Sequence, residues 1–213
     1  MSTEEITLES TDGLTLEGAV DVPPRPKAVV VLCHPHPKMG GTMNAPLLAA
    51  LRDHLVSEDW AVVRFNFRGI GASQGTSSTG TEEVSDAQGA IAYARDRLEE
   101  LPLAIAGWSF GAAVAVRAAA LDDSLAGCIA IAPAMTAEPG VTDGLPAPHE
   151  IEIDVPLLIA CGANDEVVEP EECRLWAEAA FAEHVVLKGA NHFFWGHYEQ
   201  LAVKIARWLD EVI

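Results

Sequence analysis

One short stretch constrains the fold of this chain more than any other. Residues 103–119 read LAIAGWSFGAAVAVRAA, a short apolar run followed by a G-x-S-x-G pattern centred on Ser109 and then by a run of alanine and valine. The pattern predicts a buried strand that passes into a helix through one tight turn, with the serine at its tip. Two backbones approach closely at such a turn, so the positions two before and two after the serine must be small, and both are glycine.

This turn has a chemical consequence. It points the hydroxyl of Ser109 outward and leaves the N–H groups of the first helical turn without partners beside it, ready to stabilise an anion. A chain rich in glycine and alanine can match G-x-S-x-G by chance. The strand pattern before the serine and the helix pattern after it favour a nucleophile elbow over a chance match.

The rest of the chain alternates strand and helix patterns. An antiparallel hairpin is expected at residues 5–10 and 14–20, and Thr79 and Glu82 have the spacing of a capping box at the start of a helix. Further strands are predicted at 28–33, 61–67, 103–108, 127–132, 155–161 and 185–187, and helices at 45–56, from the capping box to about 98, and at 110–121, 170–182 and 197–212. The alternation predicts a single α/β domain over residues 1–213, with a mostly parallel sheet and helices on both faces.

Composition excludes several classes of partner. The 213 residues carry a formal net charge of −19, so nucleic acid and anionic membranes are not expected to bind. No apolar stretch is long enough to cross a bilayer, and the acidic start of the chain does not resemble a secretory signal, so we expect a cytoplasmic protein. The four cysteines form no C-x-x-C pair and are interpreted as reduced core residues. The oligomeric state stays open.

A serine needs a general base, and the position of each histidine in the pattern selects the candidate. In an open parallel sheet the working edge lies at the carboxyl ends of the strands, so the base should follow a strand. Of seven histidines, His192 follows the last predicted strand directly. His197, one helical turn further on, is the nearest alternative. We therefore predict that His192 is the base.

The acid that orients the base should likewise follow a buried strand. Asp165 lies in the segment Gly-Ala-Asn-Asp that follows the buried strand 155–161, and its neighbour Glu166 is the alternative. Asp165 is preferred because the order of serine, acid and histidine along the chain is then one in which a catalytic triad is known to occur.

Acyl transfer also requires hydrogen-bond donors for an oxyanion. One is expected to be the backbone N–H of Phe110, immediately after the serine, and the other an N–H from the loop that follows the strand 28–33. That loop reads His-Pro-His-Pro from residue 34, and proline has no N–H. His36 is therefore the candidate donor, with Lys38 and Met39 as alternatives.

Two competing interpretations involve metals and nucleotides. His34 and His36 could share a metal, but no third ligand occurs at a suitable spacing. Residues 68–75, RGIGASQG, resemble a dinucleotide motif, but the third glycine is displaced and turn residues follow instead of a helix. We therefore expect neither a metal nor a cofactor.

These motifs together resemble a known family. The His-Pro-His-Pro loop with Gly-Gly and Asn44 after it, FNFRG at 65–69, GWSFG at 107–111, GAND at 162–165 and ANHFF at 190–194 are similar to those of small, lid-poor bacterial α/β-hydrolases. The resemblance covers nearly the whole chain and implies an α/β-hydrolase fold with esterase-type chemistry. Dienelactone hydrolases are also similar, but they use cysteine at the elbow, where this chain has Ser109.

The interval 133–154 is where this superfamily usually places a cap domain, and here it is too short for a helical cap. We expect a minimal cap or none, and an open site that prefers short acyl groups. Met39, Trp108, Phe193 and Phe194 are the candidate pocket residues, with Trp195 beside them.

The leading functional hypothesis is a serine hydrolase, most simply a carboxylesterase acting on small-molecule esters through an acyl-enzyme on Ser109. The alternatives are an acyltransferase or perhydrolase that uses the same three residues, and a non-catalytic binding member of the fold.

Overall fold

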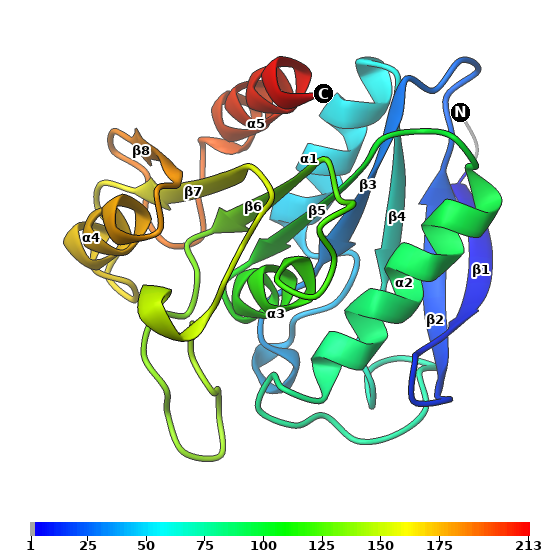
Figure 1. The fold of residues 1–213 in the computed structure, drawn as a ribbon, viewed down its shortest axis with the longest axis horizontal. Helices are drawn as coiled ribbons and strands as arrows, with labels where there is room; N and C mark the ends of the chain where they lie inside the picture. Colours follow the sequence, from blue (N-terminus) through cyan, green and yellow to red (C-terminus); the bar gives the residue numbers. More distant parts are fainter. Residues whose placement is uncertain (1–2) are drawn as a thin grey trace.

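Within the residues that the structure describes, the strands form one eight-stranded sheet. The computed structural model describes residues 3–213, and its strands lie in the order β1-β2-β4-β3-β5-β6-β7-β8 (Figure 1). β1 and β2 form an antiparallel hairpin that pairs antiparallel with β4, and all the other pairings are parallel. The strands are β1 (Thr3–Glu9), β2 (Thr15–Asp21), β3 (Ala28–Cys33), β4 (Trp60–Phe65), β5 (Leu103–Trp108), β6 (Gly127–Ile131), β7 (Leu157–Gly162) and β8 (Glu183–Leu187).

Over residues 3–213, five α-helices cover the two faces of the sheet. They are α1 (Pro46–Ser57), α2 (Glu83–Arg97), α3 (Phe110–Ala119), α4 (Pro170–Ala179) and α5 (Tyr198–Val212). Buried side chains of α2, α3 and α4 form one core cluster with the sheet, and those of α1 and α5 form the other. Figure 1 shows the same division, with α2, α3 and α4 on one side of the strands and α1 beside α5 on the other.

The alternation of side chains along a strand explains why the central strands are apolar throughout. In β3, Val29 and Val31 point into the first cluster, whereas Val30 and Leu32 point into the second. Both faces of this strand are covered, so every position is buried. The predicted architecture, a mostly parallel sheet with helices on both faces, is confirmed.

The start of α2 differs between the prediction and the structure. The capping box of Thr79 and Glu82 does not form, because Glu82 is itself helical and its side chain makes no capping hydrogen bond. The N–H groups of Ser78 and Gly80 instead donate to the buried carboxylate of Glu83, which holds the preceding loop against the helix.

The interval 133–154 carries no helical cap. Within the described residues it contains only an isolated bridge between Glu138 and Thr142 and the short 3-10 helix η2 (Pro148–Glu150). None of the helices over residues 3–213 combines the length and the apolar character that crossing a membrane requires.

Candidate active site

The elbow places Ser109 at the carboxyl end of β5. Its backbone has φ 56° and ψ −116°, a conformation that residues other than glycine rarely adopt. A Cβ on Gly107 would lie 2.1 Å from the carbonyl oxygen of Gly111, and one on Gly111 would lie 2.4 Å from that of His34. Glycine is therefore required at both positions for β5, α3 and the end of β3 to pack this closely.

A line of hydrogen bonds joins Ser109 to His192 and Asp165. The Nε2 atom of His192 lies 3.2 Å from Oγ of Ser109, and its Nδ1 atom lies 2.9 Å from Oδ2 of Asp165. The three residues follow β5, β8 and β7, whose carboxyl ends meet at one edge of the sheet. The structure therefore brings together the three residues that the sequence singled out.

The surroundings of this line set its direction. The other carboxylate oxygen of Asp165, Oδ1, accepts hydrogen bonds from the N–H groups of Val167 and Val168, at 2.9 and 2.8 Å. The carboxylate is thus held with Oδ2 toward the imidazole, which places a proton on Nδ1 and leaves the Nε2 lone pair for the serine hydroxyl. The indole N–H of Trp108 donates to the carbonyl of His192 and fixes the backbone on which the imidazole stands.

The two expected oxyanion donors are free. In the part of the chain that the structure describes, no group accepts a hydrogen bond from the backbone N–H of His36 or of Phe110. The alternative donors already have acceptors. The N–H of Lys38 donates to Nδ1 of His36, and the N–H of Met39 donates to the backbone carbonyl of His36. This geometry favours His36 as the second donor.

The side chain of His36 connects two segments of the site. With Nδ1 occupied as an acceptor, Nε2–H donates to the carbonyl of Val141 at 2.9 Å. Nζ of Lys38 also reaches the carbonyl of Gly140 at 3.5 Å. The oxyanion loop and the segment 134–142 are therefore held together, although about a hundred residues separate them in the sequence.

The side chain of His34 holds the same loop through hydrogen bonds to backbone groups. It is completely buried, its Nε2 accepts from the N–H of Phe67 at 3.0 Å, and its Nδ1–H donates to the carbonyl of Pro35 at 2.7 Å. Burial lowers the pKa of His34 from 6.5 to about 4, so the ring is neutral at pH 7. Both ring nitrogens of His34 and of His36 are engaged with backbone groups, which does not support a shared metal site.

Two cavities meet at Ser109, which lines both of them. One, of about 360 Å³, lies toward the segment 134–142, and the other, of about 320 Å³, lies toward His192. Both share His36, Met39, Ser109 and Val167 as lining residues. The serine therefore lies where the two cavities meet.

The candidate pocket residues divide into two groups. Met39, Trp108 and Phe193 line these cavities. Phe194 does not: it is completely buried in the core cluster that α5 and the sheet form, so its prediction as a pocket residue is wrong. Its backbone has φ 54°, a turn that sends adjacent side chains in different directions, and Trp195 lines neither cavity.

The alternatives for base and acid lie outside the line of hydrogen bonds. Nδ1 of His197 faces the carbonyl of Trp195, 3.0 Å away, and Glu166 makes no side-chain hydrogen bond within the described chain.

The second half of the site, formed by 134–142 and Val167, was not predicted from the sequence. Their positions after β6 and β7, at the same edge as Ser109, were the available signal.

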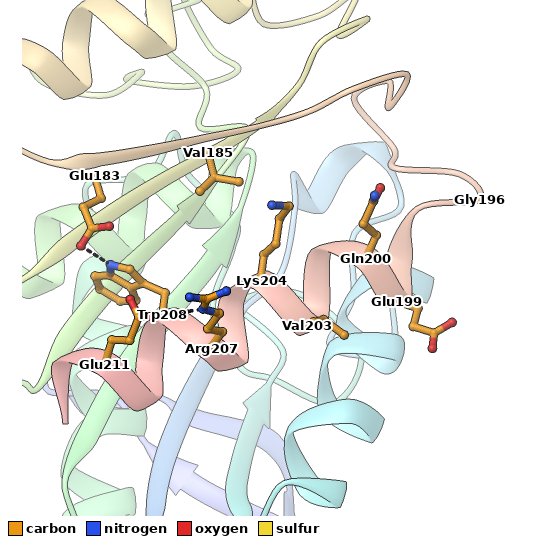
Figure 2. Close-up of a pocket in the computed structure, with 10 residues that line it drawn as sticks. All are labelled: Glu183, Val185, Gly196, Glu199, Gln200, Val203, Lys204, Arg207, Trp208 and Glu211. Carbon is orange, nitrogen blue, oxygen red and sulfur yellow. Dashed lines mark hydrogen bonds and ion pairs between the residues drawn. The ribbon is translucent and has the colours of Figure 1, made fainter.

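Another hollow, of about 860 Å³, lies away from Ser109, between the edge strand β8 and α5. Figure 2 shows that charged side chains of both signs surround it, among them Glu183, Lys204 and Arg207. Glu183 accepts a hydrogen bond from the indole of Trp208 there. None of Ser109, His192 and Asp165 contributes to this hollow, so it is not the active site.

Fold and site together define an α/β hydrolase, and comparisons with known proteins agree. The chain belongs to the family described as "Serine aminopeptidase, S33", whose model matches residues 24–151. It is 30% identical over 188 residues to an uncharacterised protein of Rickettsia prowazekii, an alignment that covers 84% of this chain and 77% of that protein.

Two solved structures are similar over nearly the whole chain. An alpha-beta serine hydrolase homologue from Coxiella burnetii is 30% identical with a TM-score of 0.85, and the match covers 97% of both chains. A serine hydrolase without a lid from Xanthomonas campestris is 27% identical with a TM-score of 0.81, and the match covers 100% of this chain and 94% of that one. The absence of a helical cap over 133–154 thus has a counterpart among solved structures.

Proposed function

We propose that this protein hydrolyses carboxylic esters through an acyl-enzyme on Ser109. The observation that carries the proposal is the continuous line of hydrogen bonds from Oγ of Ser109 through His192 to Asp165, with two unpaired N–H groups beside the serine. An imidazole that faces a hydroxyl on one side and a carboxylate on the other is arranged to remove the hydroxyl proton.

The reaction proceeds in two halves. Oγ of Ser109 bonds to the ester carbonyl carbon while Nε2 of His192 takes its proton, and Asp165 stabilises the charged imidazolium. The N–H groups of His36 and Phe110 hold the resulting oxyanion. The C–O bond to the alcohol then breaks as His192 returns the proton to the leaving oxygen, and water releases the acyl group by the same steps.

Esters are favoured over amides as substrates because the ester carbonyl is more electrophilic and an alkoxide is a better leaving group than an amide anion. The site is also open, with no helical cap among the described residues, which suits small substrates. In this proposal water is the acceptor of the acyl group, and an acyltransferase differs only in that another nucleophile intercepts the acyl-enzyme.

The test is hydrolysis of p-nitrophenyl butyrate and p-nitrophenyl palmitate. We expect faster turnover of the butyrate, and a loss of at least about 10³-fold in kcat/KM for Ser109→Ala and for His192→Ala. Ser57→Ala, at an exposed serine in α1, is the control and should keep full activity. Undiminished hydrolysis by Ser109→Ala would refute the proposal, and added methanol that diverts product to methyl butyrate more than water does would indicate a transferase.

A further inference from the structure

The two cavities at Ser109 differ in which catalytic groups they touch. The cavity toward Trp108 and Phe193 contains His192, whereas the cavity toward the segment 134–142 contains Phe110 and does not contain His192. On the basis of the proposed function, we propose that the alcohol part of the ester is an apolar, ring-bearing group that packs against Trp108 and Phe193. The acyl part lies under the segment 134–142.

The chemistry of the leaving group assigns the two sides. When the tetrahedral intermediate collapses, the bond between carbon and alcohol oxygen breaks and Nε2 of His192 gives its proton to that oxygen. The alcohol must therefore lie on the side of His192. The carbonyl oxygen occupies the donors of His36 and Phe110, so the remaining substituent, the acyl chain, extends to the opposite side.

The alcohol side is built for an uncharged ring. Its lining is apolar apart from the histidines and Ser109, and its two glycines, Gly40 and Gly41, leave room for a flat group. The ring of Phe193 meets those of His192 and Trp108 edge to face, with centroids 5.5 and 6.2 Å away, and stacks on Trp195 at 4.8 Å. Phe193 is also 36% exposed, so an aromatic group in this cavity can pack edge to face or offset-stacked against its ring.

The acyl side has a different character. Small and apolar groups such as Ala134, Met135 and Val168 lie beside polar ones, and both Glu138 and Glu172 contribute. The described lining residues of both cavities include no lysine or arginine. A carboxylate on the acyl chain would therefore meet two carboxylates and no lysine or arginine among the lining residues, so neutral acyl groups are favoured over anionic ones.

The test measures kcat/KM for four esters: ethyl acetate, benzyl acetate, ethyl butyrate and benzyl butyrate. Ethanol and benzyl alcohol are leaving groups of similar basicity, so their comparison reports binding of the ring. We expect wild type to prefer benzyl over ethyl esters by about tenfold. Monobenzyl succinate, which carries an anionic acyl group of similar length to butyrate, should react at least about tenfold more slowly than benzyl butyrate.

Two variants then separate the sides. Phe193→Ala should reduce the benzyl-to-ethyl ratio of kcat/KM to about one-third of the wild-type value or less. It should leave the butyrate-to-acetate ratio of kcat/KM within twofold of the wild-type value. Met135→Ala should instead change acyl preference. It should raise the butyrate-to-acetate ratio and leave the benzyl-to-ethyl ratio unchanged. Phe193→Leu, which keeps the apolar bulk without the ring, should give an intermediate benzyl preference.

Exchanged effects, in which Phe193→Ala alters acyl preference and Met135→Ala alters alcohol preference, would overturn the assignment. The assignment would also be overturned if either variant changed both ratios together, or if neither variant changed any ratio. These results differ from failure of the proposed function, in which no ester is hydrolysed and Ser109→Ala behaves like wild type.

Discussion

His34 makes the stability of this protein depend on pH, and the magnitude follows from its burial. Phe67 N–H donates to Nε2 of His34, and a protonated ring has no lone pair with which to accept that bond. Burial lowers the pKa of His34 from 6.5 to about 4. Between these pH values the unfolded chain binds a proton at this histidine that the folded chain does not bind, so stability falls as the pH falls.

The loss amounts to about 2.5 kcal/mol between pH 7.5 and pH 4.5, since each unit of pKa difference corresponds to about 1.4 kcal/mol. His34→Gln isolates this contribution, because the amide oxygen can accept from Phe67 N–H but does not titrate. Urea unfolding followed by tryptophan fluorescence gives the free energy of unfolding for both proteins at several pH values, and other titrating groups cancel in the difference.

We expect wild type to be the more stable protein at pH 7.5 and to lose about 2.5 kcal/mol of that advantage by pH 4.5. Parallel curves for the two proteins over this range would refute the reasoning. They would mean that His34 binds protons equally in the folded and unfolded chains.

Three further predictions concern the elbow and the oxyanion loop. Gly111→Ala should destabilise the protein by about 2 kcal/mol or more and reduce esterase activity, because its Cβ would lie 2.4 Å from the carbonyl oxygen of His34; an unchanged urea midpoint would contradict this. Ser109→Gly should be about 1 kcal/mol more stable than Ser109→Ala, because glycine adopts φ 56° without strain; the two inactive variants are compared by thermal unfolding, and equal stability would count against a strained elbow. His36→Ala should lower kcat about tenfold although its backbone N–H remains, and His36→Gln, which can still donate toward Val141, should recover part of the loss; equal rates for the two variants would argue against a positioning role.

The elements that follow strict physical patterns could be predicted from the sequence. The strand at β3 is covered on both faces and is therefore apolar at every position, and the elbow at Ser109 needs glycine on both sides. The carboxyl ends of parallel strands meet at one edge, so Asp165 and His192 could be selected by what they follow. These positions depend on local spacing and on the direction of the strands.

The remaining features depend on contacts that spacing does not encode. Phe193 and Phe194 are adjacent in a loop without periodicity, and only the turn at φ 54° determines which of them is buried. The side chain of His36 contacts Val141 across 105 residues of sequence. The buried carboxylate of Glu83 accepts hydrogen bonds from N–H groups of the preceding loop, in place of the capping box that the local pattern predicted.

Intact mass after treatment with a fluorophosphonate tests most directly whether Ser109 is an activated nucleophile. We expect a single covalent adduct on wild type and none on Ser109→Ala or His192→Ala, since the reagent requires a serine whose proton a base removes. An adduct that persists on Ser109→Ala, or the absence of any adduct on folded wild type, would contradict the account.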